Sequence, residues 1–348
     1  MSKIRTAARY LSVILTCAAI ALMAACVIAG IFIYRSRPER KAAAIWSEGG
    51  KTGYAHVAVY AKGARANGEG SPLAYLDDGS SLSVKDIESI RASLQGVIDL
   101  ASRPKKGAKD KTVKVFNWTD CYSSCLKGTI HSGSLGSGDE YEADIYAVSG
   151  SFTVMHPMEF MSGGFLSSDT TDRYQVVLND EASWSMFRSY DVIGKRIWLL
   201  GRDYTVTGVV REHEDKKARV YISFDCLEEF CSWLETPVVP AVMSYEAILP
   251  ELSTKSAHFD LSGAVPGYNI SSPSFRVVRV TGRYNVFNSF KTAATDGFDL
   301  PYWEEGALKA VSGIKTAAVL FLFGLVMLAG ITVGKLTYAT EKVKNNAK

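Results

Sequence analysis

The chain has 348 residues, 47% of them hydrophobic, and carries a formal net charge of +3. The charge is distributed unevenly, because residues 42–314 hold 27 Lys and Arg against 34 Asp and Glu, a net of −7. Nucleic-acid binding needs a basic surface, so an acidic middle region with basic ends argues against it.

Two long uncharged apolar runs lie near the ends of the chain, at Tyr10–Tyr34 and Thr316–Gly334. A bilayer core about 30 Å thick is crossed by roughly 20 apolar helical residues, so both runs predict membrane helices, over 10–34 and 316–337. A cleaved signal peptide is the alternative for the first run, but its apolar core is longer than such peptides use. A lipoprotein signal ending at Cys26 is a second alternative, and the apolar residues that follow Cys26 argue against it.

Basic residues at both ends indicate the orientation of these two helices. Lys and Arg precede the first run and follow the second, and the positive-inside rule places such residues in the cytoplasm. The N-terminal crossing alone is ambiguous, since four basic residues lie between Arg35 and Lys41. We predict cytoplasmic ends at 1–9 and 338–348 and an extracytoplasmic domain over 35–315, in a two-pass protein of the cell membrane. Aromatic residues near the membrane ends are predicted to lie at the lipid interface: Tyr34, Tyr302, Trp303 and Tyr338.

Both predicted membrane helices carry small residues at a spacing of four. In the first helix these include Ala21, Ala25 and Ala29, and in the second Gly330 and Gly334. Small residues at this spacing let helices approach closely in lipid, so we predict packing against each other or against a partner. The alternative is that Ala and Gly are simply common in membrane helices.

The middle region reads as a mixture of strands and helices. Alternating apolar residues predict a half-buried strand at Tyr54–Lys62, and Ser83 with Asp86 predicts the capped start of a helix. Further strands are predicted at Val113–Trp118, Glu142–Val148, Tyr174–Leu178, Arg196–Leu200, Tyr204–Val210, Arg219–Phe224, Glu246–Leu249 and Phe275–Thr281. Further helices are predicted at Asp180–Arg188, Cys226–Leu234 and Trp303–Lys315, the last running directly into the second membrane helix. Without regular strand–helix alternation, the pattern predicts an α+β domain, and its length predicts two subdomains.

Four cysteines lie in this middle region: Cys121, Cys125, Cys226 and Cys231. Outside the cytoplasm they are candidates for disulfides, and three pairings are possible. Local pairs require a loop at Cys121–Cys125, and the surrounding residues look loop-like. Free thiols and a zinc site are the alternatives.

Catalytic motifs are weak. Gly194-Lys195 lacks the preceding glycine of a phosphate-binding loop, and the S-x-x-K-like Ser102–Lys105 has no matching partner motifs in the required order. We therefore predict no catalytic residues, no metal and no bound cofactor. An anchored hydrolase is the disfavoured alternative.

The segment Val148–Phe224 resembles the core extracytoplasmic domain of MacB/FtsX-like ABC transporter permeases. The resemblance rests on an aromatic followed by a Gly-containing turn, a strand, a short helix, a Gly-Lys pair and a hairpin ending in Gly-Val-Val; its signature residues here are Gly194, Lys195, Gly201 and Gly208. One face of that hairpin is apolar, with Ile197 and Leu199 opposite Tyr204 and Val206. More weakly, Pro301–Glu304 resembles the residues that lead into a membrane helix of such permeases.

The resemblance implies a permease-type subunit that couples a separate ATPase, which binds the ATP, to motion of the extracytoplasmic domain. Such permeases usually have four membrane helices, and this sequence predicts two. A second permease polypeptide or a homodimer would then supply the others. The competing hypothesis is a stand-alone membrane-tethered binding or sensor module with the same fold.

Overall fold

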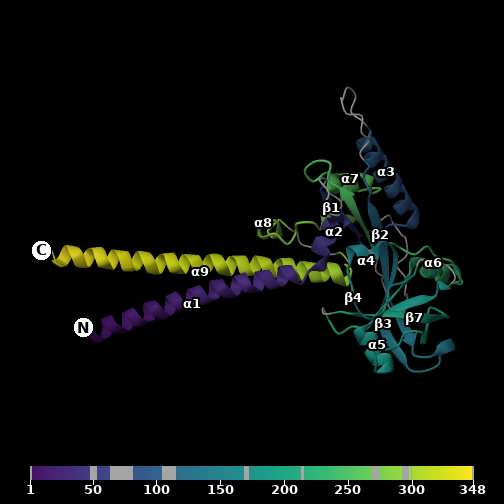
Figure 1. Ribbon diagram of the computed structural model, residues 1–348, viewed down its shortest axis with the longest axis horizontal. Coiled ribbons are helices and arrows are strands. Elements are labelled where there is room, and N and C mark those ends of the chain that lie inside the picture. The colour runs from purple at the N-terminus through teal and green to yellow at the C-terminus, as the bar shows by residue number, and fades with distance from the viewer. Residues whose placement is uncertain are drawn as a thin grey trace. The chain divides into compact units, whose positions relative to one another are not determined.

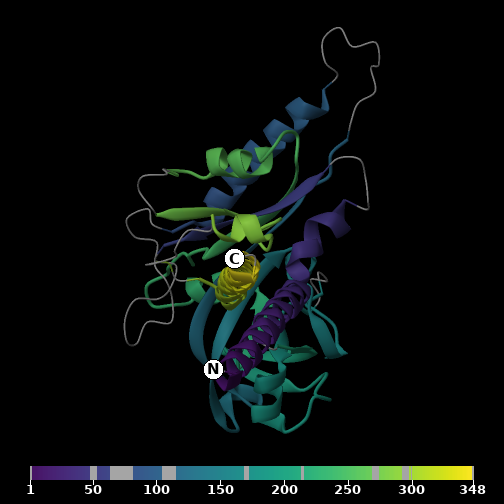
Figure 2. The same cartoon turned by 90° about the vertical axis from the view of Figure 1, so that its left-hand side faces the viewer.

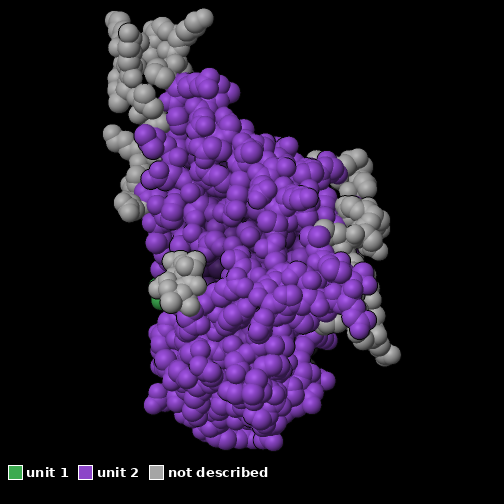
Figure 3. Space-filling view, turned by 90° about the vertical axis from the view of Figure 1, so that its right-hand side faces the viewer, with its two compact units in different colours: residues 1–37, 282–293, 306–348 green, residues 38–281, 294–305 purple. Residues whose placement is uncertain are grey.

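The computed structural model describes residues 2–47, 53–62, 81–103, 115–167, 172–212, 215–268, 274–291, 298 and 300–346. The chain divides into two compact units, coloured in Figure 3. Unit 1 comprises residues 1–37, 282–293 and 306–348, and unit 2 comprises 38–281 and 294–305.

Unit 1 contains the two apolar helices. Helix α1 runs over Ser2–Arg35, and α9 runs over Tyr302–Asn346, its first four residues belonging to unit 2. Both are long and apolar enough to cross a membrane, with candidate spans at Tyr10–Arg35 and Tyr302–Thr340. The short helix α8, Val286–Ser289, belongs to the same unit (Figure 1). The continuous helix from Tyr302 onward agrees with the predicted run into the second apolar segment.

Helices α1 and α9 touch through other residues than the predicted small-residue faces. A Cβ added at Gly324 would lie 2.7 Å from Met23, and one added at Gly313 would lie 2.9 Å from Ile33. The alanines of the predicted face, Ala21, Ala25 and Ala29, are exposed. A Cβ at Gly330 or Gly334 would meet nothing within 4 Å. Within the structure, the close approach of the two helices therefore uses Gly313 and Gly324, and packing of the predicted faces against a partner stays a prediction.

Unit 2 is the mixed body. Its strands are β1 (Tyr54–Ala61), β2 (Thr119–His131), β3 (Glu140–Gly150), β4 (Glu159–Gly163), β5 (Gln175–Asn179), β6 (Arg196–Leu199), β7 (Arg202–Arg211), β8 (Arg219–Ser223), β9 (Ser244–Pro250) and β10 (Phe275–Arg279). Its α-helices are α2 (Ala42–Trp46), α3 (Val84–Ser102), α4 (Phe152–Met155), α5 (Asp180–Phe187), α6 (Phe224–Ser232) and α7 (Ser256–Ala264). The 3-10 turns η1 (Pro38–Lys41) and η2 (Ser134–Gly136) complete the described elements.

All ten described strands join in one sheet with the order β10-β1-β9-β2-β3-β8-β5-β7-β4, and β6 pairs with β2 and β7. Neighbours are antiparallel except for β3 with β8 and β5 with β7, which are parallel. The α+β class and the two flanking apolar helices are confirmed.

The two expected subdomains are not separate compact units. The long β2–β3 hairpin explains this, because β2 pairs with β9 near its start and with β6 at its end, while β3 pairs with β8. These two central strands thus join β10, β1 and β9 on one side to β8, β5, β7 and β4 on the other, and one hydrophobic core includes residues from both sides (Figure 2).

The prediction for the start of α3 is confirmed, whereas the prediction for β1 is correct in position but wrong in burial. Helix α3 has the predicted capping box, in which Ser83 and Asp86 bond reciprocally. Strand β1 lies where predicted, but it is buried on both faces rather than half-buried, because it is flanked by β9 and β10 and covered by α2 and α7. Of the strand predicted at Val113–Trp118, the first two residues lie outside the described part, and the rest precedes β2 without forming a strand.

The predicted signature residues lie in and beside the β6–β7 hairpin. Ile197 pairs with Tyr204, and both are fully buried. The turn uses Leu200 and Gly201, whose φ of +74° favours glycine. At Gly208 a Cβ would lie 2.2 Å from the carbonyl oxygen of Gly164, so only glycine permits this backbone approach. Gly194 also has a positive φ, of +81°, and the ammonium of Lys195 lies 4.6 Å from the centre of the Phe187 ring.

Candidate functional site

The first residues of α9 lie in the interior of unit 2. Trp303 and Glu304 are buried, and the backbone N–H groups of Glu304 and Glu305 both donate to the carbonyl of Pro301, 3.0 Å away. The interfacial position predicted for Trp303 is therefore wrong, because its indole is enclosed by the body. Tyr302 and Trp303 point into two different polar clusters, each built on central strands of the sheet.

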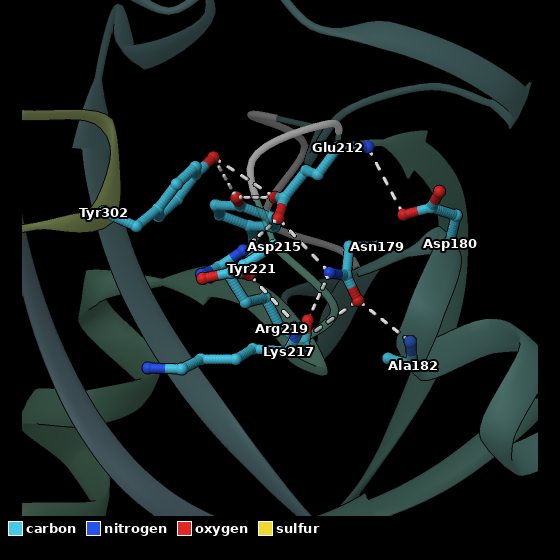
Figure 4. Close-up of polar contacts among 9 residues, drawn as sticks. All are labelled: Asn179, Asp180, Ala182, Glu212, Asp215, Lys217, Arg219, Tyr221 and Tyr302. Atoms are coloured by element: carbon cyan, nitrogen blue, oxygen red, sulfur yellow. Dashed lines mark hydrogen bonds and ion pairs between the residues drawn. The ribbon is translucent and has the colours of Figure 1, made fainter. Parts of the chain in front are cut away.

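The first, which we call the Arg219 cluster, surrounds the start of β8. Its members are Asn179, Glu212, Asp215, Arg219, Tyr221 and Tyr302 (Figure 4). The guanidinium of Arg219 donates to Glu212 and to Asp215, each at 2.7 Å, and its central carbon lies 4.1 Å from the centre of the Tyr302 ring. Only 1% of Arg219 is exposed, so its charge is held by protein groups instead of water.

Burial alone would lower the pKa of Arg219, but the hydrogen bonds and charges of Asp215 and Glu212 outweigh it, so this pKa is raised. The same contact works in reverse on Asp215. Burial raises the pKa of that carboxyl, but the hydrogen bonds and charges of Arg219 and Lys217 together lower it by more. The guanidinium of Arg219 and the carboxylate of Asp215 thus stay charged over the whole neutral range.

Two tyrosines share the remaining oxygen of Glu212. The hydroxyls of Tyr221 and Tyr302 both reach Oε1 of Glu212, the latter at 3.1 Å, and they lie 2.6 Å from each other. Two hydroxyl protons serve these three contacts, so the oxygens form a small shared network. Burial and then the charge of Glu212 raise the pKa of Tyr221 far above its usual value, which keeps this hydroxyl a donor.

Asn179, the last residue of β5, positions the cluster. Its side-chain oxygen accepts from the backbone N–H of Ala182, which caps α5, and from the backbone N–H of Arg219, both at 2.9 Å. Its amide group donates to the carbonyl of Lys217 at 2.7 Å and to Glu212 at 3.2 Å. One side chain thereby ties the start of α5 to the start of β8 (Figure 4).

The second, which we call the Glu246 cluster, comprises His56, His156, Glu246 and Trp303. The carboxylate of Glu246, on β9, lies 2.8 Å from Nε2 of His56 and 2.9 Å from Nε2 of His156. The indole N–H of Trp303 donates to the same carboxylate at 3.1 Å. Glu246 and His56 are each 1% exposed.

A carboxylate can only accept here, so both histidines must carry a proton on Nε2. Burial raises the pKa of Glu246, but the charges and hydrogen bonds of His156 and His56 outweigh it and hold this pKa well below its usual value. The carboxylate is therefore ionised and fully hydrogen-bonded.

Aromatic rings separate the two clusters and pack around both residues of α9. Tyr146 of β3 lies 5.4 Å from Tyr302 and 5.3 Å from Trp303, measured between ring centres. Phe152 of α4 lies 5.3 Å from Trp303, and His156 lies 4.7 Å from it. A third contact adds to these, since the hydroxyl of Tyr60 on β1 donates to Glu304 at 3.0 Å. The arrangement holds the start of a helix in place through strands β1, β3, β8 and β9 at once.

The four cysteines predicted as disulfide candidates are all buried free thiols. Cys121 and Cys125 lie on β2, where four residues span about 13 Å, beyond the roughly 7 Å between Cα atoms that a disulfide allows. Cys226 and Cys231 lie on α6, where five residues span about 8–9 Å. Local pairs are therefore incompatible with these elements, and the loop expected at Cys121–Cys125 is a strand. Pairing between the two sets is the form of the disulfide hypothesis that an experiment has still to test, although neither set is paired in the structure.

Zinc at these cysteines has no support either. Within the part of the chain that the structure describes, no group of three or more His, Cys, Asp and Glu side chains is placed to hold a metal ion. The clustered carboxylates are instead occupied by Arg219, the two histidines and hydroxyl groups.

Of the residues in the two polar clusters, the sequence analysis singled out only those at the start of α9, Tyr302 and Trp303. The signal that could have found the others is a charged residue within an apolar strand: Arg219 in RVYIS, Glu246 in SYEAILP and His56 in YAHVAVYA. Such residues are rarely buried without partners, so each predicts a contact from elsewhere in the fold.

The sequence of residues 13–249 matches the model of a protein family described as the MacB-like periplasmic core domain. No curated protein matches the chain. Among solved structures, the periplasmic region of MacB from Actinobacillus actinomycetemcomitans is 14% identical, with a TM-score of 0.44 over 69% of this chain and 94% of that one. The extracellular domain of the ABC-type transporter YknZ from Gram-positive bacteria is 12% identical, with a TM-score of 0.41 over 64% of this chain and 99% of that one.

Proposed function

The chain belongs to the family of MacB-like periplasmic core domains, and from this premise we propose that it is a permease-type membrane subunit of an ABC transporter or mechanotransmission complex. In this proposal a separate ATPase supplies the energy, and the chain passes motion to its extracytoplasmic domain without catalysing a reaction.

The continuity of α9 is the observation that carries the proposal. The helix begins with Tyr302 and Trp303 inside the body and continues without a break through the candidate span to Asn346. A hydrogen-bonded helix resists stretching and bending, so a displacement of its membrane part reaches the residues at its start. There Tyr302 and Trp303 would pass the force to β8 and β9 through Glu212, Arg219 and Glu246.

The proposed partners follow from the same premise. They are an ABC ATPase subunit and either a second permease polypeptide or a second copy of this chain. The described helices provide two candidate spans that could pack against the helices of that partner. The proposed location is the cell membrane, with residues 35–315 outside the cytoplasm.

Affinity capture of the detergent-solubilised full chain tests the proposal. The expected result is co-purification of an ATP-binding subunit, whose ATPase activity in proteoliposomes falls when Trp303→Ala is introduced and is retained with Trp184→Ala, a change at an exposed tryptophan of unit 2. Recovery of the chain alone, with no ATPase and no second permease, would contradict it and favour the stand-alone binding or sensor module.

Topology is tested separately, by adding protease to intact cells that express the chain. The expected result is digestion of the 35–315 region while the cytoplasmic ends survive. Protection in intact cells and digestion only after lysis would show the opposite orientation.

A further inference from the structure

Helix α8 and Phe290, the residue that follows it, expose three large apolar side chains, while the only buried side chain of α8 is the polar Ser289. Phe287 is 79% exposed, Phe290 52% and Val286 46%, while Ser289 is fully buried. At 100° per residue these three apolar positions lie within one 100° arc. A short helix in a water-soluble region normally has the reverse arrangement.

The inward side of this turn is fastened by hydrogen bonds. Asn285 caps it by accepting from the backbone N–H of Phe287 at 2.9 Å, and the amide of Asn288 donates to the carbonyl of Gly282 at 2.9 Å. The hydroxyl of Ser289 donates to the carbonyl of Val286 at 2.6 Å. The exposure of the two phenylalanines therefore belongs to an ordered turn.

The position of α8 along unit 1 is set by Tyr284, two residues before it. The side chain of Tyr284 is buried against α9, in a cluster with Ala307, Ala310, Val311 and Ile314, and Ile33 of α1 packs against the same cluster. Ile314 lies two residues before the uncharged apolar run that begins at Thr316, and Ile33 lies at the end of the other run. Both helices thus place α8 at the level where the apolar spans begin (Figure 1).

We propose that α8 is a membrane-surface element whose Val286, Phe287 and Phe290 insert among the lipids at the edge of the bilayer. This rests on the proposed membrane placement of α1 and α9 and adds a second kind of lipid contact to it. We assign the lipid surface as the partner of this apolar face because α8 lies next to the part of unit 1 that is proposed to face lipid. Lys291 directly follows α8, and Lys315 precedes the apolar run of α9, so basic groups lie where anionic headgroups would be.

Photo-crosslinking of the full chain in phosphatidylcholine and phosphatidylglycerol vesicles tests this inference. Benzoylphenylalanine replaces one residue at a time at Phe287 and Phe290, at Phe323 of the α9 span, and at Phe259 of α7, an exposed phenylalanine of unit 2. Radiolabelled lipid reports the adducts after irradiation. The expected result is about tenfold more lipid adduct at Phe287 and Phe290 than at Phe259, at a level comparable to Phe323.

The Phe323 position separates the two hypotheses. Lipid adducts at Phe323 without adducts at Phe287 or Phe290 would overturn the role of α8 and leave the membrane spans intact. No adduct at Phe323 would overturn the membrane placement itself, and the inference with it. Adducts from Phe287 to a protein instead of lipid, or equal labelling at Phe259, would also overturn it. Asn288→Ala tests the geometry, because loss of the bond to Gly282 is expected to reduce the adducts at Phe287.

Discussion

Tyr302 and Trp303 are neighbours in sequence, but they enter polar clusters of different chemistry. The Arg219 cluster pairs a cation with two carboxylates, whereas the Glu246 cluster surrounds a single carboxylate with two imidazoles and an indole. The comparison indicates that one end of a single helix is held in two ways: Tyr302 contacts a buried guanidinium and a carboxylate that pairs with it, and Trp303 contacts a buried carboxylate whose protonation in acid would break its hydrogen bonds. Breaking each cluster separately should therefore have different signatures.

Replacing the buried guanidinium should have the largest effect. Arg219→Ala leaves Glu212, which is 7% exposed, without its cation, and removal of one partner of a buried pair typically costs about 3–5 kcal/mol. Denaturant unfolding of the detergent-solubilised chain measures the loss. The matched control is Arg211→Ala, whose pair with Glu159 is largely exposed and should cost about 0–1 kcal/mol. Equal losses for the two variants would contradict the assigned role of Arg219.

The next largest effect is expected when the carboxylate of Glu246 is replaced or is protonated in acid. Glu246→Gln keeps the shape but turns an amide N–H₂ toward a histidine donor, at a cost of about 1–3 kcal/mol at neutral pH. Because the folded-state pKa of Glu246 lies below its unfolded value of 4.5, the stability that its ionisation contributes is present above pH 4.5 and is lost as pH falls.

The stability of the wild-type chain should therefore drop below pH 4.5, and Glu246→Gln should make that drop shallower. Asp215 contributes in the same direction, from its unfolded value of 3.8 downward. The raised pKa of Arg219 affects only strongly alkaline conditions, because the stability that it contributes is present at every pH below the strongly basic pKa of an unfolded arginine. Unfolding curves measured from pH 6 to pH 3.5 would contradict this account if the variant and the wild type kept a constant difference.

Smaller effects are expected when only one hydrogen bond to α9 is removed. Tyr302→Phe loses the hydroxyl that reaches Glu212 and Tyr221, and Trp303→Phe loses the N–H that reaches Glu246. Each should cost about 0.5–1.5 kcal/mol if the rings keep their packing. Only the Trp303→Phe variant should change the acid dependence, which distinguishes the two clusters in one pair of titrations.

The smallest effect on stability is expected when a reducing agent is added. All six cysteines are free, so thiol titration of the unfolded, unreduced chain should count six, and dithiothreitol should leave the unfolding midpoint unchanged. A count of two, with a lower midpoint after reduction, would show that the four cysteines of the body form disulfides after all.

The sequence predicted most of the elements because their signals are local. The two apolar helices follow from hydrophobic length, the start of α3 from Ser83 and Asp86, and the β6–β7 hairpin from alternation around a glycine turn. The prediction of secondary structure failed where contacts with distant parts of the chain determine the conformation. Strand β2 was missed at its cysteines because its polar residues are buried by partners, such as Ser123, whose hydroxyl meets that of Ser244 at 2.7 Å on β9.

By itself, the sequence determined the membrane-helix pattern, the α+β class and the family resemblance, since each depends on residues close together along the chain. Only the tertiary structure decided the candidate site. The members of the Glu246 cluster, from His56 to Trp303, are up to about 250 residues apart in sequence, and those of the Arg219 cluster, from Asn179 to Tyr302, are up to about 120 residues apart. The order of the strands brings both sets together. Burial then turns ordinary charged residues into obligatory partners, because a charge removed from water must find its opposite within the protein.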